Sequence, residues 1–317
     1  MTDDAAPEND PENDRERDEV VELWRAADPD GSRAGAIFRA TFDQLYDGQH
    51  TGRYRWNQLY KTEKTHYGTL LEINLRREFK DVITDGVRLD YRIAGYDIDC
   101  KYSQAMGGWM LPPECFGHLL LVGWADDSAG VWSLGVVRAS EENRRTSENR
   151  DGKTSLNTHG RGQIRWLRQD APLPPNVLLT LDEATVGRIF ACRTGQKRVN
   201  ELLRLVTNRR IGRNTIATVA QQDDYMKRIR DNGGARSVLR PEGYLIPSGD
   251  YRAHTEVARA LGAEVPHPGE VVSLPVVPAA LGEPHTTELD GHLWRLAQPG
   301  EPHEQAAPRL PDTRRAP

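Results

Sequence analysis

A short run of the chain, residues 90–101, contains the side chains best suited to chemistry. Asp90 lies nine residues before the first member of an Asp-x-Lys triplet that runs from Asp99 to Lys101. Because residues i and i+2 of a strand project to the same side, we expect Asp99 and Lys101 to lie side by side. A turn at Gly95 would bring Asp90 to the same point. Two carboxylates and one ammonium suit a hard divalent cation and a water, which metal-dependent phosphodiester cleavage requires.

The Asp-x-Lys triplet also has a simpler interpretation, because most such triplets are surface ion pairs worth ~0–1 kcal/mol. A further carboxylate nearby favours the catalytic interpretation. Residues 69–79 have the apolar spacing of a helix, with Leu71, Leu75 and Phe79 on one stripe. Glu72 lies at the edge of this stripe, and it is either directed into a cleft or an ordinary solvated glutamate.

Three longer blocks of sequence are more specific than the triplet. The first is Thr-Phe-Asp-Gln-Leu-Tyr-Asp-Gly at 41–48, and the second is Tyr-Lys-Thr-Glu-Lys-Thr-His-Tyr-Gly-Thr-Leu-Leu-Glu-Ile-Asn-Leu at 60–75. The third is Arg-Leu-Asp-Tyr-Arg-Ile-Ala-Gly at 88–95, followed by Asp-Cys-Lys-Tyr-Ser-Gln at 99–104. Together with the length and the two-part organisation, these blocks resemble the NaeI family of restriction endonucleases over nearly the whole chain.

The resemblance implies a nuclease with the type II restriction fold. Its catalytic set would be a helix glutamate, an aspartate and an aspartate-x-lysine pair, which fall here on Glu72, Asp90, Asp99 and Lys101. The three carboxylates would be the ligands of Mg²⁺. Lys101 would either orient the attacking water or neutralise charge on phosphorus, and the products would carry 5′-phosphate and 3′-hydroxyl ends.

The resemblance also implies what the enzyme acts on and with. The substrate would be double-stranded DNA with the palindrome GCCGGC, and a second copy of the site would act as an allosteric effector. A homodimer is expected, because cutting both strands of a palindrome needs two active sites related by a two-fold axis. A cognate DNA methyltransferase would work alongside the nuclease.

Charge is distributed unevenly along the 317 residues, although the net charge is only −5. Residues 1–30 hold 12 acids and 3 bases, whereas residues 186–260 hold 15 Lys or Arg and 7 Asp or Glu. The basic half is suited to contact DNA phosphates. No apolar run approaches the length of a membrane span and no secretory signal is present, so we expect a cytoplasmic protein without a membrane partner. The three cysteines lack metal-ligand spacing, which argues against a structural zinc site.

The elements that must position these residues form an α/β (α+β) fold. We expect a mixed sheet with flanking helices, like that of restriction endonucleases, followed by a winged helix-turn-helix domain. The predicted division is a disordered acidic tail at 1–17, a catalytic and dimerisation domain at 18–167, a linker at 168–176, a DNA-binding domain at 177–298 and a flexible tail at 299–317.

In the first half, a helix is predicted to begin near Asp18, with Val20, Val21, Leu23 and Trp24 on its buried stripe. Further helices are predicted over 34–46 and 65–79. Residues 118–124 and 130–137 are predicted to form an apolar hairpin at the centre of the sheet. The polar segment 140–162 is predicted to be an exposed loop able to meet phosphates.

In the second half, apolar spacing predicts helices near 181–190, 196–207, 214–221 and 224–230, followed by a strand–turn–strand wing over 237–247. The last of these helices would enter the major groove. The resemblance implies a DNA-binding domain of the catabolite-activator type here. The candidate DNA-contacting residues are Gln221, Gln222, Lys227, Arg228, Arg230 and Arg236.

Two other functions remain open from the residues alone. One is a winged-helix transcription regulator without nuclease activity, whose first half would dimerise or sense a ligand. The other is a strand-passage enzyme or recombinase, which would need a covalent nucleophile such as Tyr102. A regulator has no need for converging Glu72, Asp90, Asp99 and Lys101, and a tyrosine in a strand is most often a packing residue. We therefore expect a Mg²⁺-dependent nuclease.

Overall fold

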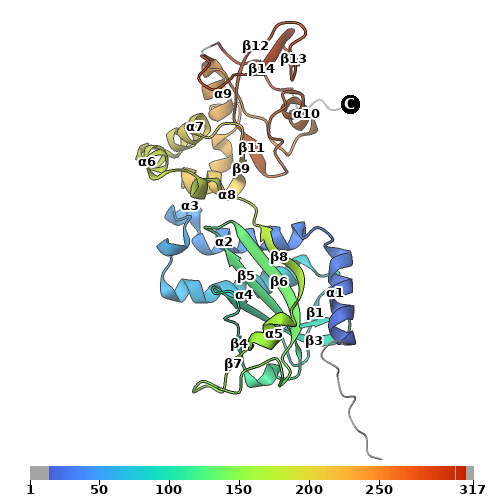
Figure 1. Cartoon of the computed structure of the whole chain (residues 1–317). Coiled ribbons are helices and arrows are strands. Elements are labelled where there is room, and N and C mark those ends of the chain that lie inside the picture. The colour runs from blue at the N-terminus through green and yellow to red at the C-terminus, as the bar shows by residue number, and fades with distance from the viewer. Residues whose placement is uncertain (1–13, 304, 312–317) are drawn as a thin grey trace, which may run out of the picture. The chain divides into compact units, whose positions relative to one another are not determined.

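The computed structural model describes residues 14–303 and 305–311. The chain divides into two compact units, which are both visible in Figure 1. The first contains the chain up to Leu45 and the segment Arg55–Pro175, and the second contains Tyr46–Tyr54 and the chain from Asn176 onward. The inclusion of Tyr46–Tyr54 in the second unit was not predicted.

The first unit is built on a six-stranded mixed sheet with the order β1-β2-β3-β5-β6-β8. Strands β3 and β5 are parallel, and the other neighbouring pairs are antiparallel. The predicted apolar hairpin is confirmed as β5 and β6, which pair from Leu119↔Arg138 to Asp126↔Val131. The strands are β1 (Thr84–Asp85), β2 (Tyr91–Ile93), β3 (Tyr96–Ser103), β5 (Leu119–Asp126), β6 (Val131–Arg138) and β8 (Arg165–Pro172).

Helices flank this sheet, as the sequence predicted. They are α1 (Arg15–Ala27), α2 (Ser32–Tyr46) and α4 (Lys61–Glu78), with the short η1 (Trp56–Gln58) between the last two. Leu71 and Leu75 of α4 are fully buried, and Phe79 stacks on Trp24 of α1 with ring centroids 4.4 Å apart. Leu23 was predicted to share the buried stripe, but it lies on the exposed side of α1.

The predicted acidic tail begins in residues that lie outside the described part of the chain, 1–13, and its last residues are ordered. Asp14 caps α1 by accepting a hydrogen bond from the backbone N–H of Arg17 at 3.1 Å. Asp14 also accepts from Arg138 of β6 at 2.6 Å. The expectation of disorder is therefore wrong for residues 14–17.

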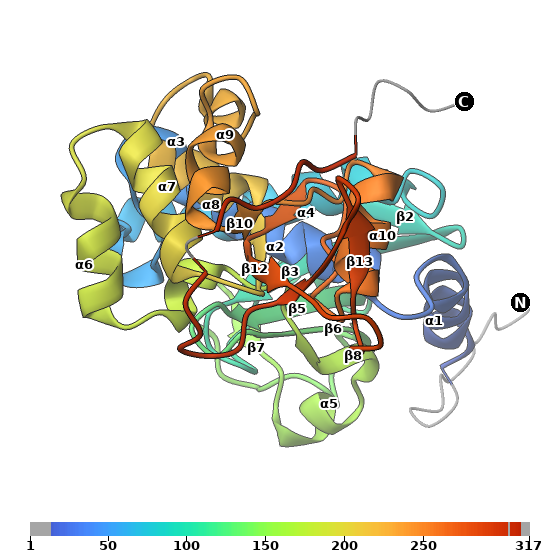
Figure 2. The same cartoon turned by 90° about the horizontal axis from the view of Figure 1, so that it is seen from above.

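The other face of the sheet is covered by the segment predicted as an exposed loop, 140–162, which is partly structured. It contains β7 (Thr154–Ser155), which pairs with β4 (Met110–Leu111), and α5 (Thr158–Gly162). Leu156 is fully buried in an apolar cluster that also contains Leu111 of β4. Figure 2 shows the sheet between α2 and α4 on one side and α5 on the other. The remaining element is η2 (Pro113–Cys115).

The predicted linker 168–176 is wrong over its first half. Arg168 to Pro172 belong to β8, which pairs with β6 at the edge of the sheet. An edge strand tolerates proline, because the missing N–H faces away from the sheet. The boundary between the two units falls after Pro175.

The second unit begins with η3 (Val177–Thr180) and three helices close to the predicted positions. They are α6 (Glu183–Ala191), α7 (Gly195–Leu205) and α8 (Arg213–Ala220). Asp182 and Thr194 cap the first two through their side chains. The short α3 (Gly48–Thr51) packs against α8. These helices bury one apolar cluster, which includes Ile189, Val199, Leu202, Leu203, Ile216 and Val219.

Two predicted elements of the second unit are wrong. The segment predicted as a fourth helix, 224–230, contains only the 3-10 turn η4 (Tyr225–Arg228). The segment predicted as a wing, 237–247, is mainly helical, with α9 (Ala235–Leu239), η5 (Arg240–Glu242) and the short β10 (Tyr244–Leu245). Pro241 within the first turn of η5 and the left-handed Gly243 at its C-cap explain the helical turn.

The strands of the second unit lie later in the chain than predicted. One sheet has the order β10-β12-β14-β13, and a smaller one pairs β9 with β11. Ser248 adds an isolated antiparallel bridge to Val271 of β11. The elements are β9 (Arg210–Gly212), α10 (Arg252–Ala260), β11 (Glu270–Val272), β12 (Leu274–Pro278), β13 (Thr287–Leu289) and β14 (His292–Leu296).

The chain after β14 was predicted to be a flexible tail, 299–317, but its described part packs on the second unit. Ala307 is buried, and its N–H donates to the carbonyl of Arg240 at 2.8 Å. The N–H of Arg309 donates to the carboxylate of Asp290 at 2.8 Å. Residues 304 and 312–317 lie outside the described part. In the described chain, no helix has the length and apolar character needed to span a membrane.

Candidate active site

The hairpin β2–β3 positions the three residues singled out by their chemistry. Its two-residue turn, Ala94-Gly95, has positive φ at both positions, 52° and 88°. Tight hairpin turns of this kind match the twist of the flanking strands. The register Tyr91↔Ile98 brings Asp90 beside β3, where the N–H of Cys100 donates to Asp90 Oδ2 at 2.9 Å. The predicted reversal at Gly95 is present.

Asp99 and Lys101 form a close ion pair on β3, as the strand spacing predicted. Lys101 Nζ lies 2.7 Å from Asp99 Oδ2. The side chain of Asp99 is only 6 % exposed and that of Lys101 is 23 % exposed. This burial separates the pair from the solvated surface pairs that usually explain an Asp-x-Lys triplet.

The two carboxylates of the hairpin lie close enough for Asp90 to influence the pKa of Asp99. Burial and the neighbouring Asp90 raise the pKa of Asp99 to about 7, although the Lys101 ammonium opposes both effects. Burial lowers the pKa of Lys101, but the hydrogen bond with Asp99 outweighs this and the pKa is raised overall. Two carboxylates this close disfavour simultaneous ionisation unless a cation compensates them.

Glu72 approaches the hairpin from α4. Burial raises the pKa of Glu72, and the charge of Asp90 adds to this effect. The hydroxyl of Tyr91 donates to the Glu72 carbonyl at 2.6 Å and so ties the helix to β2. The side chain is 27 % exposed, so Glu72 is neither a core residue nor a fully solvated one.

Arg76, which the sequence analysis did not single out, connects these groups. Its guanidinium donates to the carbonyl of Asp90 and lies 3.8 Å from Glu72 Oε1. It also pairs with Asp85 of β1 at 3.2 Å. The i, i+4 spacing from Glu72 was the available signal, because such pairs face each other on a helix.

The predicted Mg²⁺ would need several oxygen ligands close together. Among the described residues, no three His, Cys, Asp or Glu side chains are grouped closely enough to hold a metal ion. The three-carboxylate set is therefore not assembled, and the carboxylate of Glu72 lies beside Arg76. The half-buried Asp90 and the buried Asp99 have the right chemistry for a hard cation, because oxygen ligands of like charge gain most from a divalent ion between them.

The candidate DNA-contacting residues of the second unit do not lie on one recognition helix. Gln221 is the left-handed C-cap of α8 and is exposed, whereas Oε1 of Gln222 is buried without a hydrogen-bond partner. Arg228 and Lys227 pair with Asp224 at 2.7 and 3.7 Å.

The remaining two candidates differ in accessibility. Arg236 lies on α9 and is directed inward, with its Nε donating to the Ile246 carbonyl at 2.9 Å. Burial lowers the pKa of Arg236. Arg230 is exposed, as is Lys227. Of the six candidates, three are therefore exposed, namely Gln221, Lys227 and Arg230.

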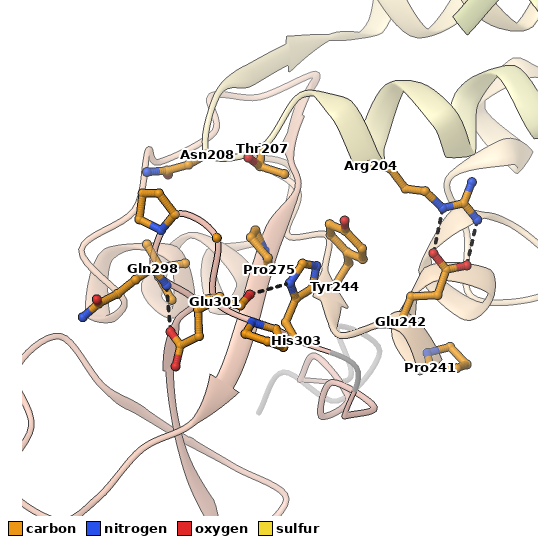
Figure 3. Close-up of a pocket in the computed structure, with 15 residues that line it drawn as sticks. Arg204, Thr207, Asn208, Pro241, Glu242, Tyr244, Pro275, Gln298, Glu301 and His303 are labelled. Carbon is orange, nitrogen blue, oxygen red and sulfur yellow. Dashed lines mark hydrogen bonds and ion pairs between the residues drawn. The ribbon is translucent and has the colours of Figure 1, made fainter. Parts of the chain in front are cut away.

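The second unit also contains a large open cavity of about 1080 Å³ between α7, η5 and the chain that follows β14 (Figure 3). Its charged groups already have partners. Both oxygens of Glu242 accept from Arg204 at 2.7 Å, and Glu301 accepts from Arg295 at 2.7 and 2.8 Å. The ring of His303 meets Tyr244 edge-on. This pairing makes the cavity a poor site for DNA phosphates.

Comparison with known proteins extends over both units. A family model described as "Restriction endonuclease NaeI" matches residues 18–305. The type II restriction enzyme NaeI of Lentzea aerocolonigenes is 48 % identical to this chain over 304 residues, which cover 93 % of the chain and 94 % of that enzyme. Since the matched region includes the β2–β3 hairpin and nearly all of the described second unit, this protein belongs to the NaeI family of restriction endonucleases, which are DNA-hydrolysing enzymes.

Proposed function

We propose that this restriction endonuclease hydrolyses double-stranded DNA with Mg²⁺ held by Asp90 and Asp99. The observation that carries the proposal is the close pair of Asp99 and Lys101 on β3, 2.7 Å apart, with Asp90 held beside it by the Cys100 N–H. The relative from Lentzea aerocolonigenes bears the name of a type II restriction enzyme. The alternative of a transcription regulator without nuclease activity is wrong, because the chain belongs to a nuclease family.

When bound, Mg²⁺ would supply an activated water and offset the negative charge of the scissile phosphate. Asp99 fixes the Lys101 ammonium, which donates a hydrogen bond to the attacking water or to a phosphate oxygen. The Cys100 N–H holds Asp90 in place. Attack in line with the leaving 3′-oxygen gives 5′-phosphate and 3′-hydroxyl ends.

We assign Glu72 a supporting role at this site. Its carboxylate lies close enough to influence Asp90 and is itself held near Arg76. In this arrangement it would position Asp90 and Arg76 rather than bind the metal directly. Such outer contacts orient the inner ligands and tune their basicity.

For the second unit we propose a winged-helix domain that binds a second DNA duplex as an effector. The strands support this topology, because β11 lies between β9 and the bridging residue Ser248. The helix that precedes Ser248 is α9, so α9 replaces the segment 224–230 as the candidate recognition helix. Binding there would favour the cleavage-competent state through a coupling of ~1–3 kcal/mol.

The finer parts of the proposal follow the NaeI resemblance. The recognition site would be GCCGGC, the active form a cytoplasmic homodimer, and the partner in the cell a cognate DNA methyltransferase. A homodimer supplies one hairpin active site for each strand of a palindrome.

A digest of a sequenced plasmid tests the proposal. We expect double-strand cuts only at GCCGGC, only when Mg²⁺ is present, and with 5′-phosphate ends on mapping. Cleavage at another sequence would overturn the proposed site, and cleavage at full rate in a chelator would overturn the metal requirement.

A further inference from the structure

An open pocket of about 330 Å³ lies in the first unit and is lined by three tryptophans, Trp109, Trp124 and Trp166. They come from the β3–β4 connection, from β5 and from β8. The polar groups at the pocket belong to Arg161, Gln169 and Asp170. The volume is at the lower end of small-molecule sites, and the aromatic walls favour a small planar ligand.

Strand register places this pocket on the same face of the sheet as the catalytic lysine. One row across the sheet runs from Lys101 to Val122, Gly135 and Trp166. This arrangement requires a glycine at position 135, because a Cβ there would lie 2.8 Å from the Trp166 ring and 2.5 Å from the Ile164 side chain. The missing side chain therefore lets the indole of Trp166 lie against the sheet.

The next row places the second wall of the pocket beside the active site. Ser103 pairs with Trp124, two residues beyond the pair formed by Lys101 and Val122. With strands ~4.8 Å apart and a rise of ~3.3 Å per residue, the Cα atoms of Lys101 and Trp124 are on the order of 8 Å apart. DNA held at Lys101 therefore passes the pocket within a few nucleotides, because each strand rises ~3.4 Å per phosphate.

A bulge in β8 directs the polar side chains of Gln169 and Asp170 toward the pocket. Two residues, Gln169 and Asp170, lie opposite the single residue Ser133 of β6, and Asp170 has a positive φ of 47°. The Ser133 hydroxyl accepts from the Asp170 N–H at 2.9 Å and so fixes the bulge. Bulges of this kind re-aim side chains next to active sites.

We propose that this pocket holds one nucleobase unstacked from the substrate duplex close to the scissile phosphate. Trp124 and Trp166 provide faces for stacking, and the amide of Gln169 and the carboxylate of Asp170 meet the hydrogen-bonding edge of the base. A carboxylate accepts from the amino group of cytosine, and an amide both donates and accepts. The inference rests on the proposed function, because it takes DNA to lie along the face that carries Lys101.

Duplex binding by the full-length chain with Asp99→Ala tests the proposal without cleavage. In a series of duplexes containing GCCGGC, one base at a time is removed from the site and from three flanking pairs. Where the removed base is the partner of the unstacked one, no base pair must be broken and binding should become tighter. We expect Trp166→Ala to reduce this gain in affinity by roughly fivefold to a hundredfold. Trp166→Phe, which keeps a stacking face, should retain the gain.

A second arm uses a mixed-sequence single-stranded hexamer, whose bases are already free to enter the pocket. We expect Trp166→Ala to weaken hexamer binding by a similar factor. Asp170→Asn should shift its base preference while leaving the fold intact, because asparagine also tolerates positive φ. If hexamer binding depends on Trp166 but the GCCGGC duplex does not bind, the proposed recognition sequence is wrong and the pocket proposal is supported. If the duplex binds and neither arm depends on Trp166, the pocket proposal is overturned.

Discussion

A heavily buried ion pair of the first unit predicts a large loss of stability on removal of one charge. Both terminal nitrogens of Arg39 in α2 donate hydrogen bonds to Asp127, which follows β5 directly. The side chain of Arg39 is 10 % exposed and that of Asp127 is 3 % exposed. We consider Asp127→Asn, which keeps the size of the side chain and removes its charge. Arg39 would then keep its ion pair with Asp43, which lies 3.1 Å away.

Breaking a buried pair by removing one partner costs about 3–5 kcal/mol, because the other charge stays buried and uncompensated. Since Asp43 remains near Arg39, we expect a value near the lower end, about 3 kcal/mol. The matched control is Asp81→Asn. Asp81 pairs with Arg33 at 2.9 Å but is 55 % exposed, so its loss should cost much less stability than the loss of Asp127.

Urea unfolding of the full-length variants, monitored by tryptophan fluorescence, measures the loss of unfolding free energy in each variant. The two units are expected to unfold in separate transitions, and only the transition of the first unit should move. Equal losses in Asp127→Asn and Asp81→Asn would refute the reasoning from burial. A loss confined to the second unit would refute the assignment of the pair to the core of the first.

Three further predictions concern the second unit and regulation. Burial lowers the pKa of His254 to about 4 from its usual 6.5, so the neutral ring contributes stability that is complete above pH 6.5 and is lost as the pH falls toward 4. We expect a loss of about 3 kcal/mol in acid unfolding curves, and His254→Gln should lack this dependence. One-site DNA should be cut slowly and accelerated by a short uncut duplex carrying the site, in a single-turnover assay; full speed without that duplex would contradict the effector model. Charge reversal at the exposed Lys227 and Arg230 should flatten the salt dependence of DNA binding, whereas reversal at the inward-directed Arg236 should instead lower stability.

The core of the fold was predictable because its signals are local. The continuous apolar residues of β5 and β6 and the helical spacing in α4 and α7 each determine their own element. The edge strand β8 was not predictable in the same way, because its proline-containing sequence resembles a linker and only pairing with β6 makes it a strand. The wing was misplaced because Tyr244, Leu245 and Ile246 have strand propensity but follow a helical turn that begins at Arg240.

The candidate site was predictable to the same extent. Asp90, Asp99 and Lys101 lie on one hairpin, so the strand period and one turn suffice to bring them together. The position of Glu72 depends on how α4 packs against the sheet, which the sequence does not specify. The tryptophan pocket was not predicted, because its walls come from segments far apart in the chain and meet only through the register of β5, β6 and β8.

The central claim is that Asp99 and Lys101 act as one buried catalytic pair beside Asp90. The most direct test compares the cleavage of a GCCGGC duplex by wild-type enzyme and by Lys101→Met at equal, measured DNA occupancy with Mg²⁺. We predict that Lys101→Met binds the duplex nearly as well as the wild type and cuts it several orders of magnitude more slowly. The reason is that losing one of several catalytic groups that act together removes most of their joint rate enhancement. A Lys101→Met enzyme that cuts at close to the wild-type rate would contradict the account.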